Sequence, residues 1–166
     1  MDGAADVADS YTIRAATKRD AERIAALWRH MADDHRALDA EVWCWADDAV
    51  EAFRGHMSEV AGKEDWVILV AETPTGEVVG FVAAEVKDRP PVHPQGKVGF
   101  VGDLVVHPKH RRKRVAEALM RATFERMRAL GAESVTLHAA LANPAAIKLY
   151  ESLGMRPVMY RMFRRL

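Results

Sequence analysis

A dense run of basic residues, placed where a strand pattern turns into a helix pattern, is the part of this sequence best suited to chemistry. The octet His107–Arg114 follows the apolar stretch Lys97–Val106 and runs directly into a helical pattern. Free backbone N–H groups and the positive end of a helix dipole meet at such a turn. Lysine and arginine side chains there can neutralise phosphate oxygens. The sequence therefore predicts an anion site that suits a diphosphate.

The octet could also have a role unrelated to diphosphate. A basic run can simply face solvent. Nucleic-acid binding would need a positive balance or stacking aromatics, whereas 24 Lys and Arg match 24 Asp and Glu and no aromatic platform is evident. His107 and His110 lack further ligands at metal-binding spacing. We therefore expect neither a nucleic-acid partner nor a bound metal.

Length and composition bound the fold. With 166 residues, of which 49% are hydrophobic and 29% charged, the chain is expected to form one globular domain. We assign residues 1–10 to a flexible N-terminal tail and residues 11–166 to that domain. The lone Cys44 excludes an internal disulfide, and neither a signal peptide nor an apolar span of about 20 residues is evident. A cytoplasmic protein without membrane association is predicted.

Periodicity predicts the elements that must position the site. Runs rich in Val and Ile indicate strands, and apolar residues three and four apart indicate helices. The expected strands are Tyr11–Ala15, Trp66–Glu72, Val78–Val86, Lys97–Val106, Ser134–Ala139 and Val158–Phe163. The expected helices begin after the capping residues Thr17 and Asp20, after Asp48, inside the basic octet and at Asn143. This order, βααβββαβαβ, predicts an α/β fold with a mixed central sheet.

Two stretches resemble the signatures of a known family. Arg111–Ala116, RRKRVA, is similar to the acetyl-coenzyme A signature Q/R-x-x-G-x-G/A of the GCN5-related N-acetyltransferases (GNAT). Asn143–Met155 is similar to that family's second signature, an Asn, an Ala and a Tyr before a Gly-apolar pair. The resemblance covers roughly Tyr11–Leu166 and implies a GNAT-like, mostly antiparallel central sheet flanked by helices.

The resemblance also implies an activity. It indicates an acetyl-CoA-dependent N-acetyltransferase that transfers an acetyl group directly to a primary amine of a small molecule, peptide or protein. Acetyl-CoA would be a cosubstrate, and a homodimer is possible because many relatives pair, often through C-terminal strands. The alternative is a non-catalytic acyl-CoA-binding or regulatory module of the same fold, suggested by Arg114 and Gly102.

The first signature departs from the family pattern at glycine positions. Arg114 stands where the family has its first glycine, and Arg112 replaces another frequent glycine, whereas Ala116 fits the last position. Glycine lets phosphate approach the backbone closely. The Arg114 side chain could turn to solvent or grip a phosphate oxygen, or it could fill the site. We expect the first outcome, because an added cation costs little beside an anion.

The resemblance assigns cofactor contacts residue by residue. It places the pantetheine arm along the backbone of a bulged strand, like an added strand, with a strand N–H near Val105 or Val106 polarising the thioester carbonyl. The diphosphate would lie on the basic turn, and Asn143 would be both a helix N-cap and a neighbour of the arm. The expected cofactor-binding residues are Leu104, Val105, Val106, Arg111, Arg112, Lys113, Arg114, Val115, Ala116, Asn143, Ala146 and Tyr150.

Candidate catalytic residues follow from the same resemblance and from the proton transfers that the reaction requires. Tyr150 would protonate the departing thiolate, although a core tyrosine is the alternative. A lysine-like amine has a pKa of about 10.4 and must lose a proton before it attacks. Asp103 is the leading base, with a structural carboxylate as the alternative. Family members often carry Glu at the preceding position, which is Gly102 here.

The acceptor amine would meet residues from the first helix, the connection after it and the hairpin. Glu85 and His35 are weaker candidates for the base, and His35 can equally be a satisfied, partly buried histidine. Trp43 lies in a connection rich in acids and aromatics, which suits a cationic amine. We therefore assign His35, Trp43 and Glu85 to substrate binding, and Cys44 to a structural role.

Overall fold

The computed structural model describes residues 11–166, so the predicted tail Met1–Ser10 lies outside the described part. The strands are β1 (Thr12–Ala15), β2 (Trp66–Glu72), β3 (Val78–Asp88), β4 (Lys97–Val106) and β5 (Ala132–Leu137). The α-helices are α2 (Ala21–Leu38), α3 (Ala49–Val60), α4 (Val115–Ala129) and α5 (Pro144–Ser152). Two 3₁₀ turns, η1 (Lys18–Asp20) and η2 (Pro108–His110), precede α2 and α4.

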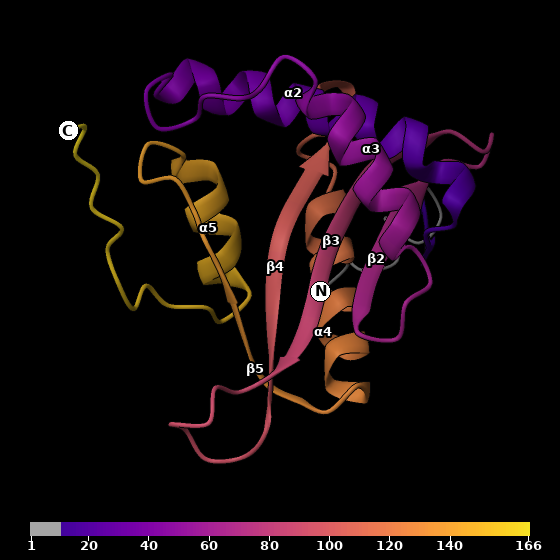
Figure 1. Ribbon diagram of the computed structural model, residues 1–166. Coiled ribbons are helices and arrows are strands. Elements are labelled where there is room, and N and C mark those ends of the chain that lie inside the picture. Colours follow the sequence, from indigo (N-terminus) through magenta and orange to yellow (C-terminus); the bar gives the residue numbers. More distant parts are fainter. Residues whose placement is uncertain (1–10) are drawn as a thin grey trace.

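The five strands form one mixed sheet in the order β1-β2-β3-β4-β5. Neighbours from β1 to β4 are antiparallel, and β5 joins β4 in parallel, after a crossover through α4. The expected α/β class with a mostly antiparallel sheet is therefore confirmed. Figure 1 shows α2 and α3 over one side of the sheet and α4 over the other.

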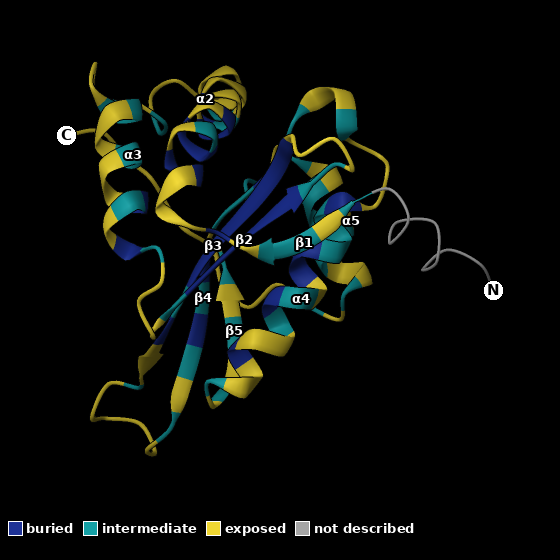
Figure 2. Ribbon diagram, turned by 90° about the vertical axis from the view of Figure 1, so that its right-hand side faces the viewer, coloured by how far each residue is buried: buried dark blue, intermediate teal, exposed yellow. Residues whose placement is uncertain are grey.

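Two apolar cores lie on the two faces of the sheet. Leu27, Met57 and Phe81 belong to the core beneath α2 and α3. Leu119 and Val82 belong to the core against α4, on which Tyr150 of α5 also packs. Figure 2 shows β3 as an almost continuous buried strand. A central strand covered on both faces carries such an unbroken apolar run.

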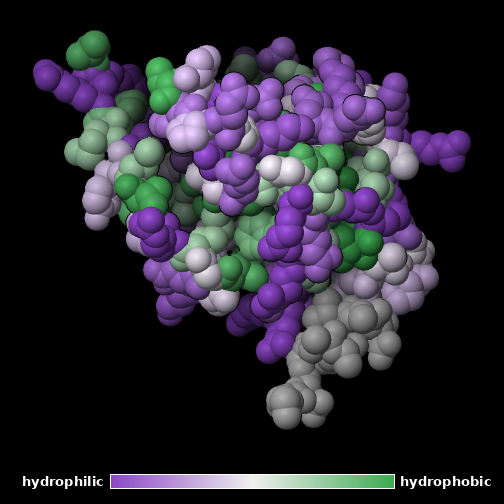
Figure 3. Space-filling model, turned by 90° about the horizontal axis from the view of Figure 1, so that it is seen from below, coloured by the Kyte–Doolittle hydropathy of each residue, from purple (hydrophilic) through white to green (hydrophobic). Residues whose placement is uncertain are grey.

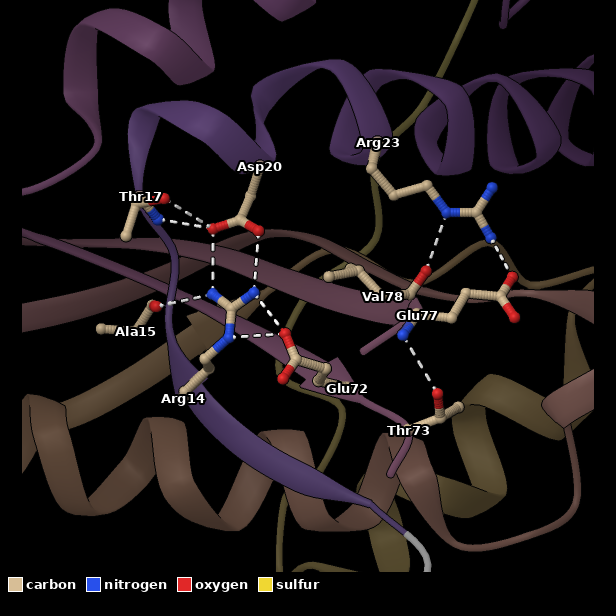
Figure 4. A network of polar contacts seen from close by, with 9 residues as sticks. All are labelled: Arg14, Ala15, Thr17, Asp20, Arg23, Glu72, Thr73, Glu77 and Val78. Atoms are coloured by element: carbon tan, nitrogen blue, oxygen red, sulfur yellow. Dashed lines mark hydrogen bonds and ion pairs between the residues drawn. The ribbon is translucent and has the colours of Figure 1, made fainter. Parts of the chain in front are cut away.

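A polar network fixes the start of the chain to the sheet. The Arg14 guanidinium donates to both Asp20 carboxylate oxygens, at 2.9 Å each, and to Glu72 Oε2 (Figure 4). The Asp20 carboxylate also accepts from the Thr17 backbone N–H at 2.7 Å, within the expected capping box. The pKa of Asp20 is lowered, and the hydrogen bond from the Arg14 side chain is the largest cause. These contacts hold β1, η1 and β2 together and so set the direction in which α2 leaves.

The predicted last strand is wrong. Val158–Phe163 pairs with no strand of the described chain, and its apolar side chains are exposed. Strand propensity measures how well a residue fits a pleated, half-buried surface, and this segment lies apart from the sheet in Figure 1. The observed order within residues 11–166 is therefore βααβββαβα.

Candidate active site

The site begins where β4 and β5 separate. The β4–β5 ladder runs only from Lys97 to Val101, while β4 continues to Val106. The β3–β4 register shifts between Ala83 and Ala84, which leaves Gly102 as the extra residue of a bulge. A bulge twists its strand locally, so the second half of β4 turns away from β5. Along that half, the side of β4 that faces β5 has no strand partner within the described residues.

The direction of the free backbone groups follows from the ladder. His107 N–H donates to Val79 O at 2.8 Å, so this residue faces β3. Alternate residues of an antiparallel pair face the same neighbour, so Val105 faces β3 as well. Leu104 and Val106 then direct their N–H and C=O groups to the open side. This alternation favours Val106 over Val105 as an N–H donor to a ligand on that side.

The turn Arg111–Ala116, which we call the cradle, holds two arginines in a backbone conformation that glycine adopts more readily. Arg112 and Arg114 both lie in the left-handed region, with φ of 61° and 59°. L-residues other than Asn and Asp rarely adopt this conformation. Arg114 is the N-cap residue of α4.

The cradle presents free donors. The first helical hydrogen bond of α4 runs from Ala118 N to Arg114 O. The N–H groups of Val115, Ala116 and Glu117 therefore have no acceptor within the helix. Around them stand exposed basic side chains and the positive helix end. This geometry fits an anion with several oxygens, as the sequence indicates.

Arg111 is already engaged by the protein. Its Nε donates to Val106 O at 3.1 Å, and its Nη2 contacts Asp34 Oδ2 of α2 at 2.7 Å. The Val106 carbonyl points to the open side of β4, so Arg111 occupies an acceptor on that edge. The side chain thus links the cradle to α2.

Asp103 lies beside the bulge and faces the core beneath α2 and α3. Its Oδ1 accepts a hydrogen bond from the indole Nε1 of Trp28 at 3.1 Å. Burial raises the pKa of Asp103 to about 6, against the Trp28 hydrogen bond and the charge of His56, which lower it. A carboxyl group with this pKa is ionised at neutral pH and remains a competent proton acceptor.

Helix α5 brings the second signature to the same end of the sheet. Asn143 Oδ1 accepts from Ala146 N at 3.1 Å, which confirms the predicted N-cap. Tyr150 packs against the core next to α4, and burial raises its pKa to about 12. Its hydroxyl keeps its proton at neutral pH, as a general acid must.

The predicted acceptor residues fall into two groups. Glu85 lies two residues along β3 from Ala83, which pairs with Asp103, so both carboxyl groups share one face of the sheet. His35 and Trp43 stack on each other, with ring centroids 5.1 Å apart, and His35 Nδ1 lies 3.0 Å from Met31 O. No hydrogen bond among residues 11–166 joins this pair to Asp103. Cys44 is exposed, so it does not pack in the core.

Sequence reasoning missed three side chains on this face. Trp28 appeared only as part of an apolar helix face, and nothing in its spacing pointed to Asp103. His56 of α3 packs edge-on against Trp66 of β2, at 5.2 Å. Trp66 pairs directly with Glu85. The packing of α2 and α3 on the sheet brings Trp28 and His56 to the candidate base, and the sheet register sets Trp66 opposite Glu85.

Three further observations on the described residues bear on ligand binding. A shallow surface hollow lined by Arg89, Pro90, His93 and Val98 lies at the far end of β4 and contains none of the predicted residues. In the part of the chain that the structure describes, no three His, Cys, Asp or Glu residues gather as metal ligands would. No helix in residues 11–166 has the length and apolarity to cross a bilayer.

The fold is shared with solved acetyltransferases. An aminoglycoside N-acetyltransferase, AAC(6')-Iy, in complex with CoA, superposes with a TM-score of 0.74 at 19% identity, over 94% of each chain. Glucosamine-6-phosphate N-acetyltransferase from Arabidopsis thaliana superposes with a TM-score of 0.68 at 20% identity, over 94% of this chain and 98% of that one. At such identities the likeness shows the fold alone.

Two curated relatives match part of the sequence. N-alpha-acetyltransferase 30 of Dictyostelium discoideum is 29% identical over 89 residues, which are 54% of this chain and 45% of the relative. Mycothiol acetyltransferase of Propionibacterium freudenreichii subsp. shermanii is 34% identical over 99 residues, 57% of this chain and 30% of the relative. The match thus spans under half the length of each relative.

The model of the acetyltransferase (GNAT) family matches residues 24–155. With most of the sequence matched and the two signatures placed at the open end of β4, the chain belongs to the acetyltransferase (GNAT) family.

Proposed function

We propose that this protein transfers the acetyl group of acetyl-CoA directly to a primary amine of a small molecule, a peptide or a protein. The observation that carries the proposal is the separation of β4 from β5 immediately before a turn with free amides at the start of α4. An extended arm suits the open edge of β4 and a diphosphate suits the cradle. One ligand that has both parts, joined in this order, is coenzyme A.

The proposed cofactor contacts use backbone first. The diphosphate would accept from the N–H groups of Lys113–Ala116, with Arg112 and Arg114 supplying charge. The arm would lie along Leu104 and Val106, and Arg111 would share or release Val106 O when the arm binds. Asn143 and Ala146 at the start of α5 would border the arm.

The proposed chemistry needs one base and one acid. Asp103 accepts a proton from the ammonium group of the acceptor, and the amine nitrogen then attacks the thioester carbonyl carbon. The Val106 N–H faces the developing oxyanion. The C–S bond breaks, and the Tyr150 hydroxyl protonates the thiolate. The second proton, which the nitrogen loses after its attack, returns to Tyr150, and the proton on Asp103 passes to solvent.

The acceptor is proposed to approach from the face beneath α2 and α3. Asp103 and Glu85 share that face, and His35 and Trp43 flank the end of α2. Carboxylates and aromatic rings together favour a cationic amine. The names of the relatives cover aminoglycoside, glucosamine-6-phosphate and mycothiol acetylation, so kinship leaves the choice of amine open.

Release of free thiol from acetyl-CoA across a panel of amines tests the function. We expect release that depends on the amine, and much slower release by Asp103→Asn with each accepted amine. Calorimetry with acetyl-CoA on the same samples distinguishes the alternative. Acetyl-CoA binding without amine-dependent release would favour a non-catalytic acyl-CoA-binding module.

We also propose a homodimer, formed through the C-terminal segment Val158–Phe163. Six large apolar side chains there and just beyond are more than half exposed: Val158, Met159, Tyr160, Met162, Phe163 and Leu166. Figure 3 shows hydrophobic and hydrophilic residues mixed at the left-hand end, where Figure 1 has this segment. β5 is an edge strand, and an exposed edge can accept a strand from another copy. We also expect the protein to be cytoplasmic and to bind neither nucleic acid nor membranes.

A further inference from the structure

Trp28 is a buried side chain that reaches from a helix to the candidate base. It lies on α2, is 6% exposed, and points its indole N–H at Asp103 on β4. The two residues are far apart in sequence, and this hydrogen bond is a polar link between α2 and the bulge of β4. A buried indole N–H normally finds a partner, and here the partner is a carboxylate.

Rings from two other segments fix the orientation of the Trp28 indole. Phe53 of α3 stacks on it, with centroids 4.8 Å apart and planes at 16°. Trp45, from the connection between α2 and α3, packs edge-on at 5.1 Å. Trp45 is itself held, because its Nε1 donates to Ala32 O at 3.1 Å. The indole cannot turn without disrupting both aromatic contacts, so its N–H direction is set before any ligand binds.

We propose that Trp28 is a positioning residue that holds Oδ1 of Asp103 and leaves Oδ2 for the proton of the acceptor amine. This inference rests on the proposed function, in which Asp103 is the base. A carboxylate beside a bulge has rotational freedom that the strand alone does not remove. A fixed donor on one oxygen decides where the other oxygen lies.

The hydrogen bond also adjusts the acidity of the base. Trp28 from α2 donates to Asp103, and the charge of His56 from α3 acts on it. Glu85 lies on the same face of the neighbouring strand β3, where it forms an ion pair with Lys87. His138 is engaged elsewhere, edge-on against Phe100 at 5.3 Å. A donor to a carboxylate stabilises its charged form. Loss of the indole N–H therefore raises the pKa of Asp103 further, since burial then acts with less opposition.

The test compares two tryptophans of the same aromatic cluster. Trp28→Phe removes the N–H donor to Asp103, and Trp45→Phe removes an N–H donor to a backbone carbonyl. We expect the acidic limb of kcat/KM against pH to move up by about one pH unit in Trp28→Phe and to stay in place in Trp45→Phe. In an Asp103→Asn background this limb should be absent, and the residual kcat/KM should keep the same pH dependence with or without Trp28→Phe. Equal shifts in the two single variants, or none in either, would overturn the inference.

A measurement on the unaltered protein needs no variant to fold and no turnover. The ¹H–¹⁵N resonance of the Trp28 indole should titrate with the pKa of Asp103, near 6, whereas that of Trp45 should not. An indole resonance of Trp28 that does not change with pH across the range of that titration would contradict the contact. If this resonance titrates while kcat/KM shows no acidic limb, the assignment of Asp103 as the base fails and the positioning role fails with it.

Discussion

Asp103 is a carboxyl group that the fold makes harder to ionise. Burial raises its pKa from 3.8 to about 6, so the folded state binds a proton more tightly than the unfolded chain does. The stability linked to this proton is complete below about pH 4 and is lost as pH rises through about 6. At about pH 8 the ionised carboxylate is therefore a cost to folding that an enzyme accepts where it needs a base.

Asp103→Asn should separate stability from activity. We expect the variant to be more stable than the native protein at pH 8 by about 1–3 kcal/mol, with the difference vanishing near pH 4. The amide oxygen of the new Asn side chain can still accept the hydrogen bond from the Trp28 indole N–H, so we expect the packing around Trp28 to be kept. Acetyl transfer should fall sharply. Urea unfolding at the two pH values is the measurement, and a variant that loses stability at the higher pH would contradict the assigned pKa.

Tyr150 is tested by removing only its hydroxyl. Tyr150→Phe keeps the ring that packs beside α4, so acetyl-CoA affinity should stay near the native value. Turnover should fall by roughly 10²–10⁴-fold, the usual contribution of a general acid. Steady-state kinetics and calorimetry separate the two effects. Unchanged turnover would remove Tyr150 from the mechanism and leave it as a core tyrosine.

At the scale of residues, the sequence predicts the local role of single side chains but not the long-range contacts between them. The basic octet, Asn143 as an N-cap and the placement of Tyr150 on an apolar helix face follow from local pattern. The link from Arg111 to Asp34 and the bond from Trp28 to Asp103 join residues separated by more than seventy positions. No local periodicity carries such information, because it depends on sheet register and on helix direction.

At the scale of single elements, the cradle has an arginine where the family signature has a glycine. Arg114 holds φ at 59°, in a region where a Cβ is disfavoured. The carbonyl of Arg114 accepts the first helical hydrogen bond of α4, from Ala118 N, so this residue is tied to the start of the helix. The residue pattern indicated a departure from the family motif, and the backbone shows what it entails here: Arg112 and Arg114 both have positive φ.

Arg114→Gly should relieve this backbone strain and leave the affinity for acetyl-CoA largely unchanged. We expect a stability gain of about 1 kcal/mol and a Tm rise of about 2–4 °C, because glycine adopts positive φ freely. Lys113→Gly is the control, since its φ is not positive and glycine there should not stabilise. Calorimetry should show acetyl-CoA affinity within about tenfold of the native value. A gain of several hundredfold would mean that the Arg114 side chain fills the cradle.

Over the whole molecule, every predicted helix and every predicted strand except the last is present, with small shifts at the ends. The exception is instructive. Val158–Phe163 has the composition of a strand, yet pairing needs a neighbour, and within residues 11–166 it has none. β5 has a free edge, and the same chain has an unpaired apolar segment. In a two-fold symmetric dimer, the segment of each copy would pair with β5 of the other.

The dimer proposal is tested by mass in solution. Sedimentation equilibrium should give twice the 18.5 kDa of one chain. Tyr160→Pro removes a backbone N–H from the segment and should yield a folded monomer. Val92→Lys, at another highly exposed apolar residue, in the loop after β3, should leave the dimer intact. A native protein that stays monomeric at all concentrations, or a Tyr160→Pro variant that still dimerises, would contradict the proposal.

The most direct test of the account is a crystal structure with coenzyme A bound. We expect the diphosphate on the backbone N–H groups of Lys113–Ala116 and the arm beside Leu104 and Val106, with the Arg114 guanidinium turned outward or on a phosphate oxygen. A ligand bound elsewhere, with the Arg114 side chain folded over those amides, would contradict it.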